Sequence, residues 1–248
     1  MTETAPIRLL VFDIDGVLTD GEAQPLDLEL LAQLRRMNRA ARQNPNLPAA
    51  TLCTGRPAPY VEIMLQAIDG HVPGIYENGT GLYLPETYQF LPHPKVGNGT
   101  NFAEVRRILQ RSLVQSGEAF IQPGKEFSMS LFAWEPVNTP ALYDKSVAAL
   151  GSLAETVELE FAASCLNVMP RGLHKGAGLA FLIEKTGYAP ESMLGVGDSN
   201  IDLPFLAMTG YAAAPSNANE AVKAAVQYVA PRPTSDGVRD ILRHFGLE

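Results

Sequence analysis

The stretch Val11-Phe12-Asp13-Ile14-Asp15-Gly16-Val17-Leu18-Thr19-Asp20 places two aspartates directly after an apolar run. That run, residues 7–12 with one charged interruption, is typical of a strand buried on both faces of a parallel sheet. Ligands of open α/β sheets bind beyond the carboxyl ends of the strands, where Asp13 and Asp15 follow. Two neighbouring carboxylates repel each other unless a proton or a cation intervenes, and Mg2+ prefers oxygen ligands. The stretch therefore predicts a Mg2+ site; the alternative is an Asp-rich turn punctuated by Gly16.

The composition is that of an ordinary soluble globular protein, with 248 residues, 46% hydrophobic and 19% charged, and a net charge of -8. This charge does not suggest a nucleic-acid partner, and no apolar stretch approaches the roughly 18 residues that span a membrane. The start has no secretory pattern, and Cys53 and Cys165 make neither a disulfide framework nor a metal cluster. We therefore expect a cytoplasmic protein without nucleic-acid or membrane partners. Its oligomeric state stays open.

Strand-like and helix-like segments alternate in the first and last thirds of the chain. This order predicts a doubly wound parallel sheet of the α/β class, a Rossmann-like core. The expected helices are 26–41, 57–68, 174–186, 217–225 and 235–245, and the expected strands are 49–53, 74–76, 193–196, 211–214 and 227–229.

The middle of the chain has a different order, helix-strand-strand-helix-strand-strand, after a hairpin expected at 82–84 and 88–91. We expect the apolar stripe Phe127-Met129-Leu131 and Trp134 to form its core. Residues 1–82 and 170–248 are thus predicted to form a catalytic core, and residues 83–169 a smaller α+β insert. The insert's expected helices are 102–115 and 139–153, and its expected strands are 118–122, 126–134, 156–161 and 165–169.

Four polar features follow expected core strands or begin a core helix. They are Asp13 with Asp15, Thr54-Gly55-Arg56, Lys175, and Gly197-Asp198-Ser199-Asn200-Ile201-Asp202. In a parallel sheet these positions converge on one edge. Together they supply a carboxylate nucleophile, a second carboxylate for proton transfer, a hydroxyl, an ammonium and a further acidic pair. Phosphoryl transfer through an aspartyl-phosphate needs these groups, since cationic charge must offset the repulsion between nucleophile and phosphoryl group.

These four features resemble, in the same order, the four motifs of the haloacid dehalogenase superfamily of phosphatases. The resemblance covers nearly the whole chain. The insert resembles the α/β cap that the Cof and sucrose-phosphatase-like branch carries after its third core strand. Within that branch, Glu77-Asn78-Gly79, residues 197–204 and His244-Phe245 are similar to the archaeal-type phosphoglycolate phosphatases.

The resemblance implies a Mg2+-dependent hydrolase of phosphomonoesters, acting on phosphoglycolate or a sugar phosphate. Asp13 would attack phosphorus, and Asp15 would protonate the leaving oxygen and then activate water. Lys175 would hold phosphoryl oxygens and support catalysis. The substrate would also meet the second motif and the turn after the third strand: Thr54, Gly55, Arg56 and Asn78.

The same resemblance implies that Mg2+ binds the carboxylates of Asp13 and Asp198 and the backbone carbonyl of Asp15. Three neighbours would orient these ligands: Ser199, Asn200 and Asp202. The chain departs from the branch at Ile201, where its members usually have Asn. Asn200 lies one position earlier and would point in another direction from a helical turn.

Other interpretations stay open. A phosphomutase or phosphotransferase would use the same residues with a sugar hydroxyl as acceptor, and a non-enzymatic receiver-like module would group acidic residues, Thr and Lys in a much shorter chain. Singly, Arg56 and Lys175 could be solvated helix residues, and Asn78 a turn residue. Residues of the insert that point into the site, near Lys125, Glu126 or Arg171, are expected to select the substrate.

Overall fold

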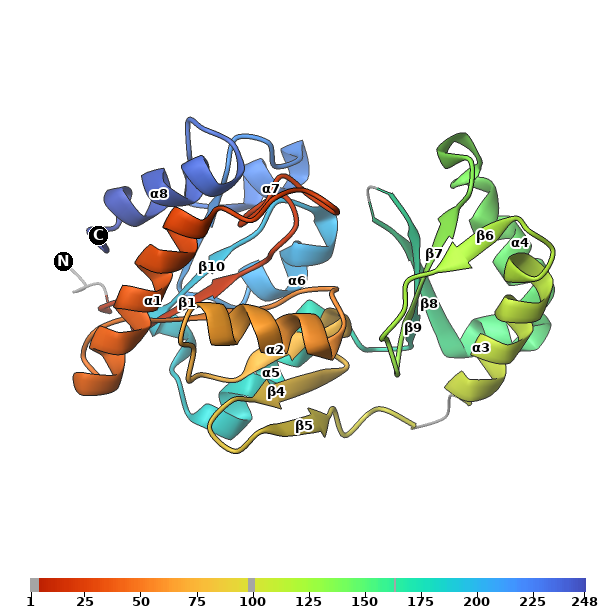
Figure 1. Ribbon diagram of the computed structural model, residues 1–248, viewed down its shortest axis with the longest axis horizontal. Helices are drawn as coiled ribbons and strands as arrows, with labels where there is room; N and C mark the ends of the chain where they lie inside the picture. Colours follow the sequence, from red (N-terminus) through yellow and green to blue (C-terminus); the bar gives the residue numbers. More distant parts are fainter. Residues whose placement is uncertain (1–4, 98–100, 163) are drawn as a thin grey trace.

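The central sheet of the protein is parallel and carries helices on both faces, which confirms the predicted fold class. The computed structural model describes residues 5–97, 101–162 and 164–248. Figure 1 shows two lobes, and the sheet lies in the one that holds both termini. Its strand order is β12-β11-β10-β1-β2, all parallel. The strands are β1 (Leu9–Phe12), β2 (Ala49–Leu52), β10 (Met193–Val196), β11 (Tyr211–Ala214) and β12 (Tyr228–Val229).

Strand β1 is buried on both faces, as its apolar run predicts. Leu10 and Phe12 pack with α1 (Leu28–Gln43), α2 (Ala58–Ala67) and α8 (Thr234–His244). Leu9 and Val11 point to the other face. The helices packed there are α5 (Lys175–Thr186), α6 (Leu203–Leu206) and α7 (Glu220–Ala225). The two layers of helices leave the carboxyl ends of the strands open toward the second lobe (Figure 1).

A small antiparallel sheet extends this core lobe. It consists of β3 (Gly74–Tyr76), β4 (Gly81–Leu84) and β5 (Gln89–Pro92), and the pair Cys53–Ile75 bridges it to the end of β2. Leu82 and Leu91 pack in the same apolar cluster as α5. A domain boundary between residues 82 and 83 would divide this hairpin, so we propose that the core continues to Pro92.

The second lobe is the insert, a four-stranded antiparallel sheet of order β6-β7-β9-β8. Its helices cover one face of the sheet with an apolar cluster of their own, and the other face looks toward the core lobe (Figure 1). The elements follow the predicted order: α3 (Phe102–Leu109) with a π turn (Gln110–Val114), β6 (Ala119–Ile121), β7 (Met129–Ala133), α4 (Ala141–Leu150), β8 (Val157–Phe161) and β9 (Leu166–Pro170). The 3-10 turns of the two lobes are Glu77–Gly79, Pro136–Asn138, Gly151–Thr156, Pro190–Ser192 and Asn200–Asp202.

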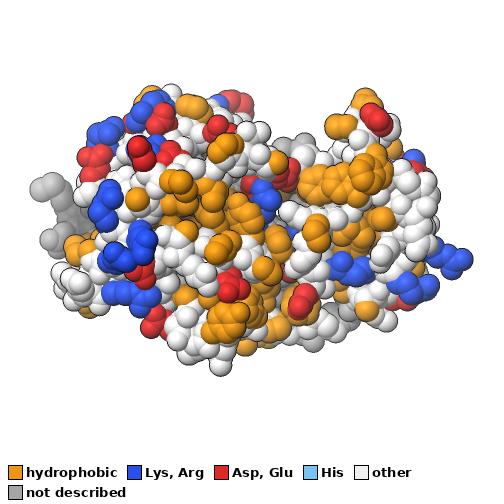
Figure 2. Space-filling view, in the orientation of Figure 1, with side chains coloured by type: hydrophobic (Ala, Val, Ile, Leu, Met, Phe, Trp, Pro, Cys, Tyr) orange, Lys and Arg blue, Asp and Glu red, His pale blue; other side chains and the backbone are white. Residues whose placement is uncertain are grey.

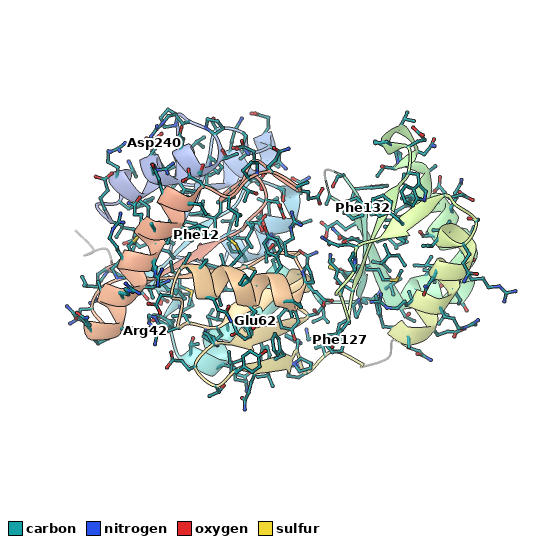
Figure 3. All side chains as sticks on the ribbon, viewed as in Figure 1. Phe12, Arg42, Glu62, Phe127, Phe132 and Asp240 are labelled. Atoms are coloured by element: carbon teal, nitrogen blue, oxygen red, sulfur yellow. The ribbon has the colours of Figure 1, made fainter. Side chains whose placement is uncertain are left out.

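Two expectations for the insert core are wrong. Trp134 is 62% exposed, because alternation along β7 directs it to the face without helices, where its ring lies 4.7 Å from that of Phe120. Phe127 packs against the core lobe, at the junction of the two lobes (Figure 3). Met129 and Leu131 do lie in the insert's own cluster.

The first residues of the expected strand 126–134 do not join the sheet, and β7 begins only at Met129. The carboxylate of Glu77, from the core lobe, accepts hydrogen bonds from the backbone N–H groups of Glu126, Phe127 and Ser128 at 2.9, 3.0 and 2.9 Å. It also accepts one from Ser128 Oγ at 2.8 Å. A side chain of one lobe thus satisfies backbone donors of the other.

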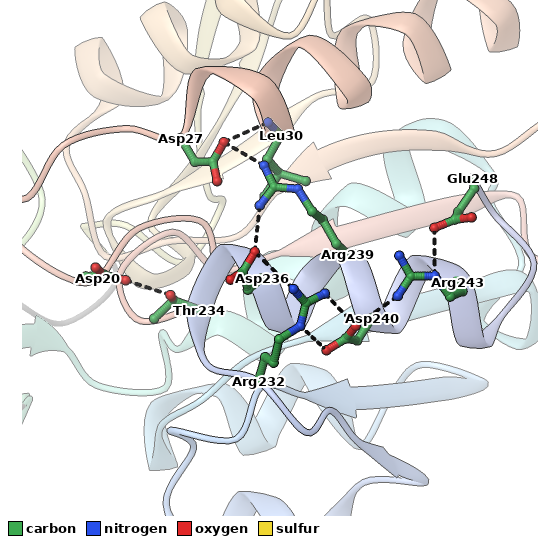
Figure 4. A network of polar contacts seen from close by, with 10 residues as sticks. All are labelled: Asp20, Asp27, Leu30, Arg232, Thr234, Asp236, Arg239, Asp240, Arg243 and Glu248. Atoms are coloured by element: carbon green, nitrogen blue, oxygen red, sulfur yellow. Dashed lines mark hydrogen bonds and ion pairs between the residues drawn. The ribbon is translucent and has the colours of Figure 1, made fainter.

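A network of polar contacts ties the C-terminal helix to the loop that follows the two aspartates (Figure 4). Arg239 donates to Asp27 Oδ1 at 2.8 Å, and the same oxygen accepts from Leu30 N at the start of α1. Thr234 Oγ1 donates to Asp20 at 2.6 Å. The hydrogen bond from Arg239 lowers the pKa of Asp27 to about 2. The loop of residues 20–27 is therefore held by residues of α8, which are far away in sequence.

The charge of the surface concerns nucleic-acid partners, and the length and apolar character of the helices concern membranes. Figure 2 shows Lys and Arg side chains interspersed with Asp and Glu over the visible face, rather than gathered into one basic surface. Within the described part of the chain, no helix has both the length and the apolar character needed to cross a bilayer.

The contact between α5 and the turn after β3 requires glycine. A Cβ atom on Gly178 would lie 2.6 Å from Gly79 Cα and 2.6 Å from Ile75 Cγ2. Gly79 has φ +99°, and a Cβ on it would lie 2.3 Å from the carbonyl oxygen of His174. The close approach brings the start of α5 to the end of β3.

We predict that Gly178→Ala lowers the free energy of unfolding by about 1–2 kcal/mol. The overlap with backbone atoms outweighs the roughly 1 kcal/mol by which a helix prefers Ala to Gly. Urea denaturation followed by circular dichroism measures it. The control is Glu184→Ala on the exposed side of α5, expected within about 0.5 kcal/mol of the parent. A Gly178→Ala protein as stable as the parent would contradict the prediction.

Candidate active site

A pocket of about 480 Å³ lies between the carboxyl end of the parallel sheet and the insert. Asp13 continues β1 into this pocket, with its backbone N–H donating to Val196 O at 3.0 Å, and its side chain is buried. The core lobe lines the pocket with the residues of all four predicted motifs. The insert lines it with residues of β7, β8, β9 and the loops beside them.

Lys175 is the cation of the site. It begins α5, is 1% exposed, and its Nζ lies 2.9 Å from Asp13 Oδ1 and 2.6 Å from Asp202 Oδ1. Burial by itself would lower the pKa of Lys175, but the charges of Asp13 and Asp202 outweigh burial and raise it. The ammonium therefore stays protonated, buried between two carboxylates.

Asp202 holds both Lys175 and the loop of the fourth motif. Its Oδ2 accepts from Asp198 N at 2.9 Å, Ser199 N at 3.0 Å and Ser199 Oγ at 3.1 Å, while its Oδ1 accepts from Lys175. Both oxygens are therefore engaged. Although one oxygen each of Asp13, Asp198 and Asp202 lies within 4.8 Å of the others, Asp202 fits a positioning role better than that of a metal ligand.

Asp13 and Asp198 provide the donor set that a divalent cation requires. Asp198 Oδ1 is buried and has no hydrogen-bond partner within residues 5–97, 101–162 and 164–248. A Cβ on Gly16 would lie 2.2 Å from Asp198 Oδ2, so only glycine allows this approach. Burial, together with the charge of Asp202, raises the pKa of Asp198 to about 7, and burial also raises the pKa of Asp13. Crowded carboxylates with an unpaired buried oxygen fit a hard cation such as Mg2+.

Asp15 forms a bidentate ion pair with Arg56. Arg56 Nε donates to Asp15 Oδ2 at 2.7 Å and Nη2 donates to Oδ1 at 2.6 Å, which raises the pKa of the arginine. The guanidinium carbon also lies 4.8 Å from the ring centroid of Tyr60. In this arrangement Arg56 orients Asp15. Contact between Arg56 and substrate stays a prediction.

The second motif and the turn after β3 meet at the pocket floor. Thr54 is fully buried, and its carbonyl accepts from Asn78 N at 2.9 Å. Asn78 is left-handed, with φ +56°, and its Oδ1 is buried without a partner among the described residues. A Cβ on Gly55 would lie 2.9 Å from that oxygen, so glycine is needed there too. The sequence predicted Asn78 at the site only because this residue follows a core strand.

The remaining motif residues lie at the rim of the pocket. Asn200 Oδ1 accepts from Asn219 Nδ2 at 2.9 Å, and Ile201 lines the pocket beside it. Asn219 N donates to Asp198 O at 2.9 Å, and Asn217 Nδ2 donates to Gly16 O at 2.9 Å. Sequence reasoning missed these two asparagines of the loop after β11, since only the fold brings that loop to the site.

Of the three positions near which substrate-selecting residues were expected, one lines the pocket. Lys125 is buried and lines the pocket, whereas Glu126 and Arg171 are exposed and do not line it. Ser130 and Asn167 line it as well and were not predicted. The serines that alternate with Met129 and Leu131 indicated a polar face of this strand. Alternation does not say, however, which face looks toward the core lobe.

Comparisons with known proteins agree with this geometry. A family model described as haloacid dehalogenase-like hydrolase matches residues 142–242. A phosphoglycolate phosphatase of Methanopyrus kandleri is 26% identical over 236 residues, which cover 95% of each chain. The family model and this relative both point to the haloacid dehalogenase superfamily. The predicted family and the predicted enzyme class, a phosphatase, are confirmed.

Two further known proteins are similar to this chain, one in sequence and one in fold. A phosphoglycolate phosphatase of Methanothrix thermoacetophila is 34% identical over 96 residues, 39% of this chain and 43% of that protein. A solved sugar phosphatase of subclass IIB of the superfamily has a TM-score of 0.68 at 21% identity. It covers 97% of this chain and 100% of its own, so the two share both lobes of the fold.

We predict that Lys175→Met lowers the free energy of unfolding by about 3–5 kcal/mol, because it leaves Asp13 and Asp202 buried without their cation. Urea denaturation in the presence of a chelator measures the change. Lys185→Met, an exposed position of the same helix, is the matched control and is expected within about 0.5 kcal/mol of the parent. Equal stability of the two variants would show that Lys175 does not hold the site together.

Proposed function

We propose that this phosphatase is a Mg2+-dependent phosphomonoester hydrolase that acts on a small phosphorylated metabolite through an aspartyl-phosphate. The observation that carries the proposal is the buried carboxylate of Asp13 with Lys175 Nζ at 2.9 Å, at the bottom of a pocket open to a ligand. The relatives named phosphoglycolate phosphatase and sugar phosphatase support phosphoglycolate or a sugar phosphate as the substrate.

In the proposed reaction an oxygen of Asp13 attacks phosphorus as the bond to the leaving oxygen breaks. Asp15 gives a proton to the leaving oxygen and then takes one from the water that hydrolyses the aspartyl-phosphate. Arg56, through its two hydrogen bonds, keeps the Asp15 carboxyl turned toward the pocket. Lys175 shares its charge between Asp13 and the incoming phosphoryl group.

Mg2+ would be held by the carboxylates of Asp13 and Asp198 and by the backbone carbonyl of Asp15. When bound, it supplies positive charge that keeps these carboxylates ionised beside a phosphoryl group. The hydroxyl of Thr54 and the amide of Asn78, which line the pocket, would donate to phosphoryl oxygens. The insert excludes bulk water from the pocket, which strengthens these interactions.

Replacing the nucleophile tests the proposal. Asp13→Asn keeps the shape of the side chain and removes its negative charge, so hydrolysis of 4-nitrophenyl phosphate should fall by roughly 10⁴-fold or more. The exposed Asp144→Asn is the control and should retain parent activity. Full activity of Asp13→Asn would exclude the mechanism. Labelled phosphate that passes to an added sugar rather than to water would instead indicate a phosphotransferase or mutase.

Mg2+ binding can be followed without catalysis. In the metal-free protein the raised pKa of Asp198 favours its neutral form in the folded state, so stability should fall as pH rises from about 4 to about 7. Since the ion needs ionised ligands, added Mg2+ should raise the unfolding temperature more at pH 8 than at pH 5.

Asp198→Asn should remove the Mg2+ effect and weaken the pH dependence, to which Asp13 also contributes, whereas the exposed Asp236→Asn should keep both. Differential scanning calorimetry with and without chelator measures each variant. An equal Mg2+ effect in Asp198→Asn and the parent would rule out Asp198 as a ligand.

A further inference from the structure

The insert carries a buried ammonium in the pocket, opposite the site of phosphoryl transfer. Lys125 is 7% exposed, and its Nζ donates to Ser130 Oγ at 2.5 Å. It forms no salt bridge with any carboxylate that the structure describes. An ammonium has three N–H donors, so two remain for the pocket. A buried cation without an anionic partner is costly and is stabilised by a ligand that supplies one.

The hydrogen bonds of two neighbours of Lys125, Ser130 and Asn167, occupy their acceptor oxygens. Because Ser130 Oγ accepts from Lys125, its hydroxyl donates to Asn167 Oδ1, at 2.6 Å. Cys165 Sγ donates to the same oxygen at 3.8 Å. The oxygen of Asn167 is therefore occupied, while its Nδ2 makes no hydrogen bond to the described residues. The pocket wall of the insert thus offers N–H groups of Lys125 and Asn167.

The position of Lys125 is fixed from both lobes. Arg106 Nη2, from the insert, donates to the carbonyl of Lys125 at 2.8 Å and to that of Ser128 at 2.8 Å. Glu77, from the core lobe, accepts the next three backbone N–H groups. The backbone that carries the ammonium is therefore held before any ligand arrives, which lowers the entropic cost of binding.

We propose that Lys125 and Asn167, oriented by Ser130, bind a carboxylate on the leaving group, so that the preferred substrates are phosphorylated hydroxy acids. This inference rests on the proposed function. One positive charge and two donor groups match the single charge and two oxygens of a carboxylate. A second phosphate would bring two negative charges to a pocket that Glu22 also lines. A neutral sugar would leave the ammonium without a counter-charge.

Paired substrates that differ only at the acid test the inference. The pairs are 2-phosphoglycolate with 2-hydroxyethyl phosphate, and 3-phosphoglycerate with glycerol 3-phosphate; 2,3-bisphosphoglycerate and glucose 6-phosphate complete the set. The parent enzyme should favour an acid over its neutral partner in kcat/KM by about 10- to 100-fold, as expected for hydrogen bonds to a charged group. A preference for the bisphosphate or for the neutral partners would overturn the proposal.

Lys125→Met should bring the acid-to-neutral ratio close to one, and Lys125→Arg should restore much of it because the positive charge returns. Asn167→Asp places a carboxylate beside Lys125 that competes with the substrate, so it should also lower the ratio without loss of side-chain volume. Lys145→Met, an exposed lysine of α4, is the control and should keep the parent ratio. If Lys125→Met fails to fold, the acid-to-neutral ratio of Asn167→Asp still tests the proposal.

Binding separates this inference from the proposed function. If the parent hydrolyses neither these substrates nor 4-nitrophenyl phosphate, the proposed hydrolysis fails. Isothermal titration of 3-phosphoglycerate and glycerol 3-phosphate into the parent and Asn167→Asp proteins then tests the carboxylate site alone. Tighter binding of the acid, lost in Asn167→Asp, supports the site. Equal binding of the two ligands overturns it.

Discussion

The buried ammonium of Lys175, shared between Asp13 at 2.9 Å and Asp202 at 2.6 Å, is the interaction on which the rest of the site depends. It joins three elements, the end of β1, the start of α5 and the loop after β10. Without it, two carboxylates would be buried side by side. Asp202 in turn holds the backbone of Asp198 and Ser199, so the cation also sets the place of the proposed metal ligand.

Much of this arrangement could be predicted from the sequence because it rests on local pattern and on one topological rule. An apolar run ending in Asp13 predicts a buried strand, and helical spacing after it predicts the doubly wound core. The rule that ligands bind at the carboxyl ends of parallel strands then gathers four separate motifs. Lys175 could not be assigned to the site by itself, because a lysine at the start of a helix is usually solvated. Its place in sequence order with the aspartates of the other motifs predicts a role in the site.

The sequence could not predict which side chains distant in sequence pair with one another, or which face of a strand packs on helices. The ion pair of Arg56 with Asp15 was not predicted, because it joins residues 41 apart in sequence. The alternation of β7 gives two faces without saying which one packs on helices. Trp134 was therefore assigned to the wrong face, and Ser130 was left unassigned. Side-chain pairing and the docking of one sheet face depend on long-range packing, which periodicity does not encode.

Glu77 and Asn78 are neighbours in one turn, yet the first holds the insert and the second lines the pocket. A motion that opened the cleft would cost least if it kept the four hydrogen bonds to Glu77, which would make that carboxylate the pivot. Residues next to a pivot travel the shortest arc, so Lys125 would stay near its place while Trp134, at the far end of β7, would swing widest. An acid entering an opened cleft would then meet its counter-charge before the lobes close around it.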